Sequence, residues 1–160
     1  MLSRIIISIG ILSLMVGQPT EVGGIISENT TWTSDNRPTY VVTAPLLING
    51  DVTLTIEPGV QVLFQEGTYL YVNGELIAQG TNSEKILFTS ADGFDINTNP
   101  LEGDWGQIKF FADAIDATFI GENYSGGSIL EYCIIEYGQG VYLESSHPFI
   151  NHCIIRYHSS

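Results

Sequence analysis

The sequence predicts an all-β fold in which the chain winds as a parallel β-solenoid of about five rungs, a rung being one full circuit of the chain. The main observation is a repeat: the ten residues 129–138 recur as 149–158, with Cys, Ile, Ile and Tyr at equivalent positions and an offset of 20 residues. Short apolar runs separated by Gly, Asn and Pro turns precede this repeat, and no window shows helical periodicity. A fixed offset of this length is typical of stacked solenoid coils.

The segment 1–20 has the pattern of a secretory signal peptide. Arg4 is its only charged residue, and the apolar run Ile5–Val16 is shorter than a bilayer span requires. The cleavage position is expected between Gly17 and Gly24, and no cysteine follows the run, which disfavours a lipoprotein anchor. The sequence therefore predicts a secreted or cell-surface protein with no membrane span after removal of the signal.

Residues 21–45 are polar and rich in threonine, with Trp32 and Tyr40 as large apolar anchors. Because a solenoid must shield the open end of its first coil, we expect this segment to be an N-terminal cap. The rungs are then expected to occupy residues 46–160 and to continue beyond the chain end. An uncapped last rung leaves an unpaired edge, so end-to-end self-association through that rung is also expected.

Short runs of apolar residues alternate with turn residues after the cap. The expected strands are 46–48, 52–56, 60–64, 69–72 and 75–78. An offset of 24 residues aligns Leu47–Val52 with Tyr71–Leu76 and Val62–Phe64 with Ile86–Phe88, and an offset of 22 aligns the last of these with Ile108–Phe110. Antiparallel hairpins would need no such translation, so the offsets predict parallel rungs with loops of different length.

The order of several short motifs adds a family resemblance. The motifs are Thr31–Thr33, Leu54–Val60, Asn73–Ala78, Ile86–Ser90, Gly103–Phe110 and Ser128–Tyr132. In this order they resemble the secreted right-handed parallel β-helix proteins of the pectin-lyase-like superfamily, from about Thr30 onward. The resemblance implies an exported protein of which this chain is the N-terminal portion. Members range from polysaccharide lyases and hydrolases to adhesins.

The chain has 18 acidic and five basic residues, which gives a net charge of −13. Neutralising phosphates requires clustered Lys and Arg, so nucleic acid is excluded as a partner, and an anionic membrane surface is disfavoured. The acidic residues are spread along the chain, which favours a solvated surface. Attraction for divalent cations is the alternative.

The most polar segment, 91–104, contains six candidate metal ligands. They are Asp92, Asp95, Asn97, Asn99, Glu102 and Asp104. The spacing from Asp95 to Asn99 copies the start of a calcium-binding loop, but Pro100 and Gly106 occupy positions where such a loop needs Gly and Glu. The segment is therefore a candidate for a looser Ca²⁺ site or, alternatively, a solvated loop without a metal.

Aromatic side chains form a second candidate site. Its members are Trp105, Tyr132, Tyr137, His152 and Tyr157. The repeat is expected to stack Tyr132 on His152, Tyr137 on Tyr157, Glu131 on Asn151 and Glu136 on Arg156. Such an outer strip of aromatic rings and polar groups suits a polysaccharide or glycan. The alternative is structural, since the same stacks stabilise a solenoid without a ligand and Trp105 could be an apolar lid where the polar loop rejoins the solenoid.

Cys133 and Cys153 occupy equivalent positions in the repeat. Equivalent Cα atoms of neighbouring parallel strands lie roughly 4.8 Å apart, within the range of a disulfide, but their Cβ vectors are parallel. We therefore expect a ladder of free thiols, with a disulfide as the alternative. No metal-ligand spacing surrounds either cysteine.

No catalytic residue is predicted. The Asn-Thr-Asp, Gly-Asp-Asp and Gly-His-Gly motifs of β-helix polygalacturonases are absent, and neither Arg37 nor Arg156 lies near an acidic loop, as the calcium-and-arginine chemistry of pectate lyases would require. The sequence favours a non-catalytic extracellular scaffold for adhesion or glycan contact. The alternative is the N-terminal part of a polysaccharide lyase or glycoside hydrolase with its catalytic rungs beyond Ser160. Ice binding is a weaker candidate, because the threonines of 53–55 do not recur one rung on.

Overall fold

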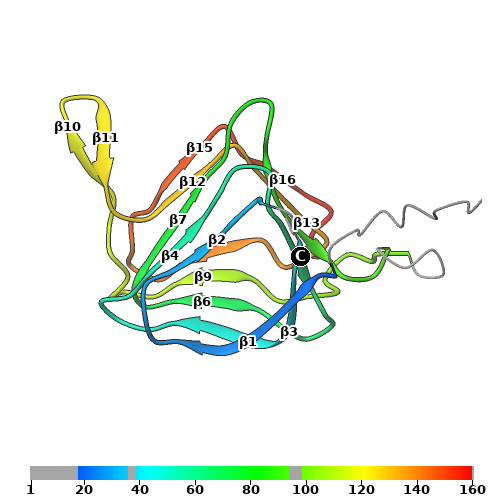
Figure 1. Ribbon diagram of the computed structural model, residues 1–160. Coiled ribbons are helices and arrows are strands. Elements are labelled where there is room, and N and C mark those ends of the chain that lie inside the picture. Colours follow the sequence, from blue (N-terminus) through cyan, green and yellow to red (C-terminus); the bar gives the residue numbers. More distant parts are fainter. Residues whose placement is uncertain (1–17, 36–38, 94–98, 160) are drawn as a thin grey trace, which may run out of the picture.

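The computed structural model describes residues 18–35, 39–93 and 99–159, and it shows a parallel β-solenoid of about five turns with a triangular cross-section (Figure 1). This part of the chain contains strands and no helix, and therefore no helix that could cross a membrane. The strands are β1 (Thr20–Ile26), β2 (Thr30–Trp32), β3 (Thr39–Ile48), β4 (Thr53–Ile56), β5 (Gln61–Phe64), β6 (Leu70–Val72), β7 (Glu75–Gln79), β8 (Ile86–Ser90), β9 (Ile108–Phe110), β10 (Thr118–Ile120), β11 (Asn123–Gly126), β12 (Ile129–Glu131), β13 (Cys133–Glu136), β14 (Val141–Leu143), β15 (Phe149–Asn151) and β16 (Ile154–Arg156). The predicted fold class is confirmed.

The solenoid has three faces, each a ladder of parallel strands. The first face stacks β2, β4, β7, β12 and β15. The second face stacks the first half of β3 with β5, β8, β13 and β16, and the third stacks the second half of β3 with β6, β9 and β14. β3 belongs to two faces because its pairing passes from β5 to β6 between Val42 and Leu46, and β1 follows both halves of β3.

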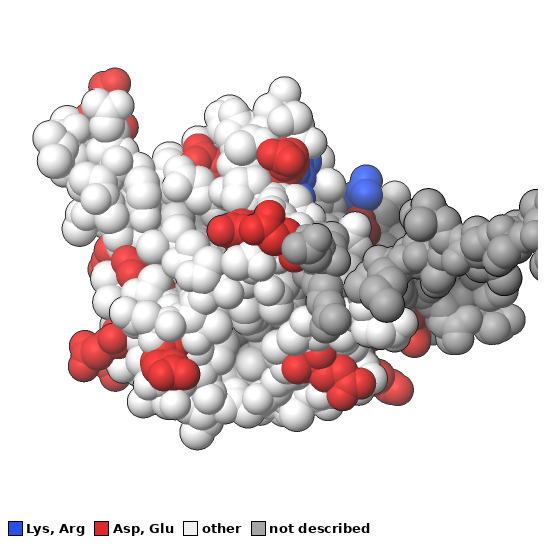
Figure 2. Space-filling view, viewed as in Figure 1, with Lys and Arg blue, Asp and Glu red and all other residues white. Residues whose placement is uncertain are grey.

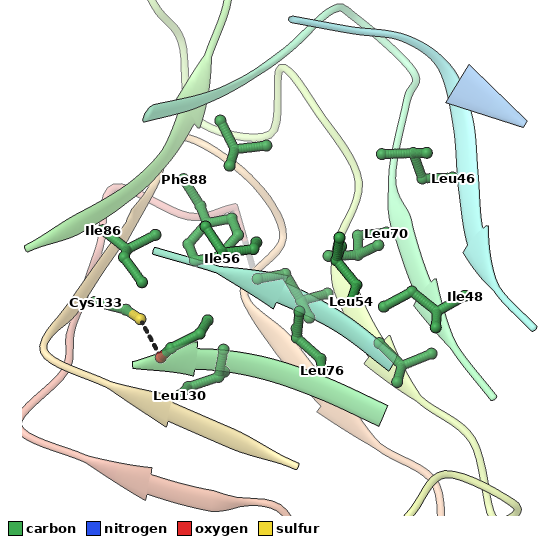
Figure 3. Packing of buried hydrophobic residues seen from close by; sticks show 14 of the residues in the cluster. Leu46, Ile48, Leu54, Ile56, Leu70, Leu76, Ile86, Phe88, Leu130 and Cys133 are labelled. Carbon is green, nitrogen blue, oxygen red and sulfur yellow. Dashed lines mark hydrogen bonds between the residues drawn. The ribbon is translucent and has the colours of Figure 1, made fainter. Parts of the chain in front are cut away.

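The core lies inside the triangle and is built by strand alternation. Every second residue of a strand points inward, so β4 buries Leu54 and Ile56 while β8 buries Ile86 and Phe88 (Figure 3). The same alternation places Leu76 of β7 over Leu54. Fully burying one such side chain contributes about 1.5–3 kcal/mol relative to leaving it in water. The inward ladders therefore supply the main stabilisation, and they leave the alternate positions on the outer surface.

The 20-residue repeat is confirmed as two stacked rungs. Ile129 pairs with Phe149 on the first face, and Ile134 pairs with Ile154 on the second. Cys133 is fully buried, and its thiol donates to the Ala78 carbonyl on the preceding rung at 3.4 Å (Figure 3).

The predicted register of the earlier rungs is only partly correct. Leu47 pairs with Tyr71 at the predicted offset of 24, but Leu54 lies over Leu76, so the predicted alignment of Val52 with Leu76 is wrong by two residues. The first corner, Asn49 to Val52, is two residues longer than its counterpart after Asn73. The alignment of Val62 with Ile86 is wrong for a similar reason, because Val62 pairs with Phe88.

The predicted match of Ile86–Phe88 with Ile108–Phe110 is also wrong. β8 pairs with β13 on the second face, whereas β9 pairs with β6 on the third. The two segments are successive sides of one rung rather than equivalent sides of successive rungs. Residues 91–107 are inserted between them.

The segment predicted to be a cap already belongs to the solenoid. β1 pairs in parallel with β3, and β2 pairs in parallel with β4, so the stacked strands begin near Thr20 rather than at residue 46. Trp32 is buried against Tyr40, with ring centroids 4.7 Å apart, as expected for the two apolar anchors. The predicted signal segment falls almost wholly on residues 1–17, outside the described residues.

One antiparallel hairpin interrupts the solenoid. β10 and β11 pair with each other and stand away from the body between β9 and β12 (Figure 1). The hairpin and the 91–107 insertion lie in the same rung, which explains why that rung has no clear sequence repeat.

Candidate functional site

An open groove of about 320 Å³ runs over the outer surface of the second face. Its lining includes Leu63, Leu87, Gln61 and Thr89 from β5 and β8, together with Glu136, Tyr137, Asp92 and Pro100. Strand register brings the floor together, because Gln61 pairs with Leu87 and Leu63 pairs with Thr89. The result is an apolar floor edged by carboxylate, amide, hydroxyl and phenol groups, a composition typical of small-ligand sites.

The loop beside the groove is held by one carboxylate. Asp104 Oδ2 accepts hydrogen bonds from the buried Ser90 hydroxyl at 3.0 Å and from the Leu101 amide at 2.7 Å. The same Ser90 oxygen accepts a bond from the Asp92 amide at 3.0 Å. Asp92 and Pro100 are thereby fixed at the edge of the groove.

Trp105 is fully buried and cannot offer a ring face to a sugar. Its ring stacks on Phe64 with centroids 4.2 Å apart, and its indole N–H donates to the Glu136 carbonyl at 2.9 Å. A Cβ atom at Gly138 would lie 2.4 Å from this ring, so glycine is needed there. The structure therefore removes Trp105 from the predicted glycan surface and shows the alternative role, an apolar lid.

Glu136 links the groove to the last strand. Its Oε2 accepts a hydrogen bond of 2.8 Å from Arg156 Nε and forms an ion pair with Arg156 Nη2 at 2.8 Å, while its Oε1 accepts a longer bond of 3.3 Å from Thr89. Hydrogen bonding to Glu136 raises the pKa of Arg156, so the guanidinium stays charged. The predicted stacking of Glu136 on Arg156 is confirmed, and this cation of the described part of the chain is already paired.

Two aromatic columns flank the outer surface of β13 and β16. Tyr132 stacks on His152 with centroids 4.6 Å apart, and Tyr137 stacks on Tyr157 at 5.1 Å, as the repeat predicts. The strand rise places the two columns on the order of 15 Å apart. His152 and Tyr157 are exposed, and Tyr137 also lines the groove.

These four residues adopt an unusual backbone conformation. Their φ angles lie between 48° and 63°, in the left-handed region that glycine and asparagine enter most readily. The left-handed conformation costs other residues roughly 1–2 kcal/mol each. Each column therefore contains two residues whose backbone conformation is energetically unfavourable.

Residues 24–145 match the model of a family described as a pectate-lyase like β-helix domain. The chain belongs to the pectate-lyase-like β-helix family. A search of curated proteins found no match, and a search of solved structures found none. The match agrees with the resemblance drawn from the sequence and covers the groove strands β5, β8 and β13.

The predicted calcium ligands are only partly placed in this pectate-lyase-like domain. Asp95 and Asn97 lie outside the described residues. Asp92, Asn99 and Glu102 are exposed, and Asp104 is occupied by the loop contacts given above. Within the described ranges, no group of three or more His, Cys, Asp or Glu side chains is arranged to hold a metal. Calcium binding stays a prediction for this loop.

The two cysteines form the predicted ladder of free thiols. The Cys153 thiol donates to the Leu130 carbonyl at 3.2 Å, one rung above the bond from Cys133 to Ala78. The hydrogen bond between the two thiols, together with burial, raises the pKa of Cys133 far above its ordinary value. The same bond lowers the pKa of the half-buried Cys153 to about 7.

Sequence reasoning found the aromatic columns of this β-helix domain but missed the groove. Gln61, Leu63, Leu87 and Thr89 carry no motif, and they meet only through the register of β5 with β8. That register differs by two residues from the predicted one. The alternation of β5 and β8 could have marked these side chains as outward-facing, but it could not have shown which of them are neighbours.

Proposed function

We propose that this domain is an exported, non-catalytic scaffold that holds a glycan on the outer surface of the second face. The groove would hold part of the sugar chain against the half-buried Leu87, and the aromatic columns would extend the contact across β13 and β16. Sugar rings present C–H faces to aromatic rings and hydroxyl groups to polar side chains. Both kinds of partner are present on this surface.

The observation that supports the proposal most strongly is the placement of aromatic rings at strained corners. Two residues with positive φ in one column cost roughly 2–4 kcal/mol together. A stacked pair returns about 0.5–1.5 kcal/mol beyond the area it buries. The area that the rings bury adds to this return, so each column can persist at its strained corners, and there it presents aromatic rings at fixed places on the outer surface for a ligand to contact.

The groove also supports binding over catalysis. Glycoside hydrolysis uses two carboxyl groups that act across the scissile bond. Both oxygens of Glu136 already accept hydrogen bonds, from Arg156 and Thr89, so this carboxylate is committed to the structure of the groove. Asp92 is then the remaining carboxylate in the described lining.

Binding can be tested with the purified chain on an array of polysaccharides, followed by calorimetry with an oligosaccharide from any positive spot. Tyr137→Ala is expected to weaken binding about tenfold or more, since a lost aromatic–ligand stack costs on the order of 1 kcal/mol or more. Tyr142→Ala is the matched control, because Tyr142 is also exposed but lies on β14 of the third face. Equal losses for both variants, or no binding to any polysaccharide, would contradict the proposal.

Catalysis is tested in the same samples by measuring newly formed reducing ends and unsaturated products. We expect neither. Their release from any bound polysaccharide would favour the alternative, a polysaccharide lyase or glycoside hydrolase.

Export is a separate part of the proposal and rests on the sequence pattern of residues 1–20. Expression of the full chain in a secreting host, followed by mass spectrometry of the extracellular protein, should give a new N-terminus between Gly17 and Gly24. Retention of Met1 in cell-associated protein would contradict export by a cleaved signal.

A further inference from the structure

We infer that the groove selects uncharged glycans and rejects polyuronates, with Asp92 as the residue that determines this specificity. The inference rests on the proposed glycan-binding function and adds the chemical class of the ligand. It concerns the part of the lining that the structure describes.

The charged groups that line the groove are all negative. Asp92 and Glu136 contribute carboxylates, and no Lys or Arg belongs to the described lining. Figure 2 shows a similar imbalance on one face of the whole molecule, where Asp and Glu side chains far outnumber Lys and Arg. Since the charge of Glu136 is matched by Arg156, a uronate chain in the groove would place its own carboxylates beside the uncompensated carboxylate of Asp92.

The cations of the described residues cannot balance such a chain. Arg156, the nearest along the second face, donates from Nε to Glu136 Oε2 at 2.8 Å, and its Nη2 forms an ion pair with the same oxygen at 2.8 Å. Lys109 lies on the third face and pairs with Glu144 at 2.5 Å. Lys85 lies at the corner before β8, and its ammonium donates to the Asn82 carbonyl at 2.7 Å. None of the three belongs to the described lining of the groove, and the positive charges of Arg156 and Lys109 are already matched by carboxylates.

The hydrogen-bonding groups of the groove also match hydroxyl groups rather than carboxylates. The Asp92 carboxylate lines the groove and has no side-chain partner among the described residues. An ionised carboxylate only accepts hydrogen bonds, so it needs a donor from the ligand. A sugar hydroxyl supplies that donor and forms a strong charge-assisted bond, whereas an ionised uronate carboxylate has no proton to donate.

Hydrogen bonds of the loop hold the residues at the edge of the groove in place. The backbone N–H of Asp92 donates a hydrogen bond to the Ser90 hydroxyl oxygen, and that hydroxyl donates in turn to the Asp104 carboxylate, so the backbone at Asp92 is fixed. Glu136 is fixed by Arg156 and Thr89. The Asp92 carboxylate therefore acts on any ligand that lies between the β8 loop and β13, and the Arg156 charge stays matched by Glu136.

The test is isothermal titration calorimetry of the purified full chain with paired oligosaccharides of equal length, one neutral and one uronate, in a buffer with a metal chelator. We expect the neutral oligosaccharide to bind at least about tenfold more tightly than the uronate. Raising the salt concentration should strengthen uronate binding and leave neutral binding unchanged, because salt screens charge repulsion.

Asp92→Asn is the diagnostic variant, since it removes a charge from an exposed side chain without a structural bond of its own carboxylate. We expect it to improve uronate binding several-fold while it keeps or weakens neutral binding. Glu122→Gln removes the same charge from the exposed turn of the β10–β11 hairpin and should leave both ligands unaffected.

Three outcomes separate the inference from the proposed function. Tighter binding of the uronate than of the neutral sugar to the unmodified chain would overturn the inference and leave the glycan-binding function intact. Equal effects of Asp92→Asn and Glu122→Gln on uronate binding would also overturn it, because the groove would then not be the determinant. If neither class of oligosaccharide binds, the proposed function itself fails.

Discussion

At the scale of single residues, the main feature of the second face is the four aromatic residues at the corners beside β13 and β16. Each of β13 and β16 has one of these aromatic residues shortly before it and one directly after it, and all four have a positive φ: Tyr132, Tyr137, His152 and Tyr157. Glycine at such a corner would relieve the strain, because it has no Cβ to meet the following carbonyl. The aromatic side chains therefore lower the stability of the corner relative to glycine, and only contacts beyond the corner compensate for them.

The φ of 63° at Tyr137 predicts that glycine is a less destabilising substitution than alanine there, the reverse of the usual order within a strand. Both Tyr137→Ala and Tyr137→Gly lose the stack on Tyr157, but only alanine keeps the strain of a Cβ at positive φ. The glycine variant should be more stable than the alanine variant by about 1 kcal/mol, as measured by urea unfolding. Residue 63 provides the control: it lies inside β5 at an ordinary φ, and there the alanine variant should be the more stable one.

The thiol ladder gives a second prediction at this scale. The pKa of Cys153 is lowered to about 7, and its side chain is half-buried, whereas Cys133 is fully buried with a raised pKa. Since the thiolate is the reactive form, iodoacetamide should label Cys153 first in the folded protein, at a rate that increases as the pH rises through about 7. Peptide mapping identifies the labelled residue. Initial labelling of Cys133, or equal labelling of both cysteines, would contradict the assignment.

At the scale of elements, the sequence predicted most where successive rungs are closest in length. Residues 129–158 carry an uninterrupted 20-residue repeat, so the pairing of β12 with β15 and of β13 with β16 was correct residue by residue. The rung that contains β8, β9 and β12 carries the loop at 91–107 and the β10–β11 hairpin, so no constant offset describes it. Matching of apolar triplets such as Ile86–Phe88 and Ile108–Phe110 then failed, because every inward ladder of this fold has a similar composition.

The irregular rung also explains why the groove could not be predicted from the sequence, whereas the aromatic columns could. The aromatic columns lie within the regular repeat and could be paired from the sequence. The groove lies where β8 meets the inserted loop, and its lining depends on hydrogen bonds such as that from Ser90 to Asp104, which no sequence spacing indicates.

One contact between corners predicts a specific pH dependence. Asp116, after β9, accepts bonds from the His147 amide at 2.7 Å and from its ring Nδ1 at 3.1 Å, and these lower the pKa of Asp116 below its usual 3.8. A lowered folded-state pKa contributes stability above the unfolded value, and this is lost as the pH falls through the folded value. Asp116→Asn should therefore reduce stability by a few tenths of a kcal/mol at pH 5 to 7 and by less near pH 3, since the pair is exposed. Urea unfolding across this range measures it. Asp113→Asn, in the same corner, should show no such difference.

At the scale of the whole molecule, the two kinds of outer surface have opposite tendencies. The chain has 18 acidic residues against five basic ones, acidic side chains outnumber basic ones in the view of Figure 2, and like charges keep such surfaces apart. The end of the solenoid is different. β14, β15 and β16 each pair with a strand on one side only within the described residues, and Leu143, Ile150 and Ile154 are exposed there. Unpaired strand edges with apolar side chains favour association.

The 160-residue chain is therefore expected to self-associate end to end through β14–β16. Sedimentation velocity over a hundredfold concentration range should show a rising mean mass, and higher salt should increase it because the acidic sides repel one another less. Ile154→Lys should shift the equilibrium toward monomer, since a charge on an edge strand opposes pairing. The control variant Ile120→Lys places the same charge on another exposed isoleucine, in the β10–β11 hairpin, and should leave association unchanged. A concentration-independent monomer, or equal effects of the two lysines, would show that this end does not mediate association.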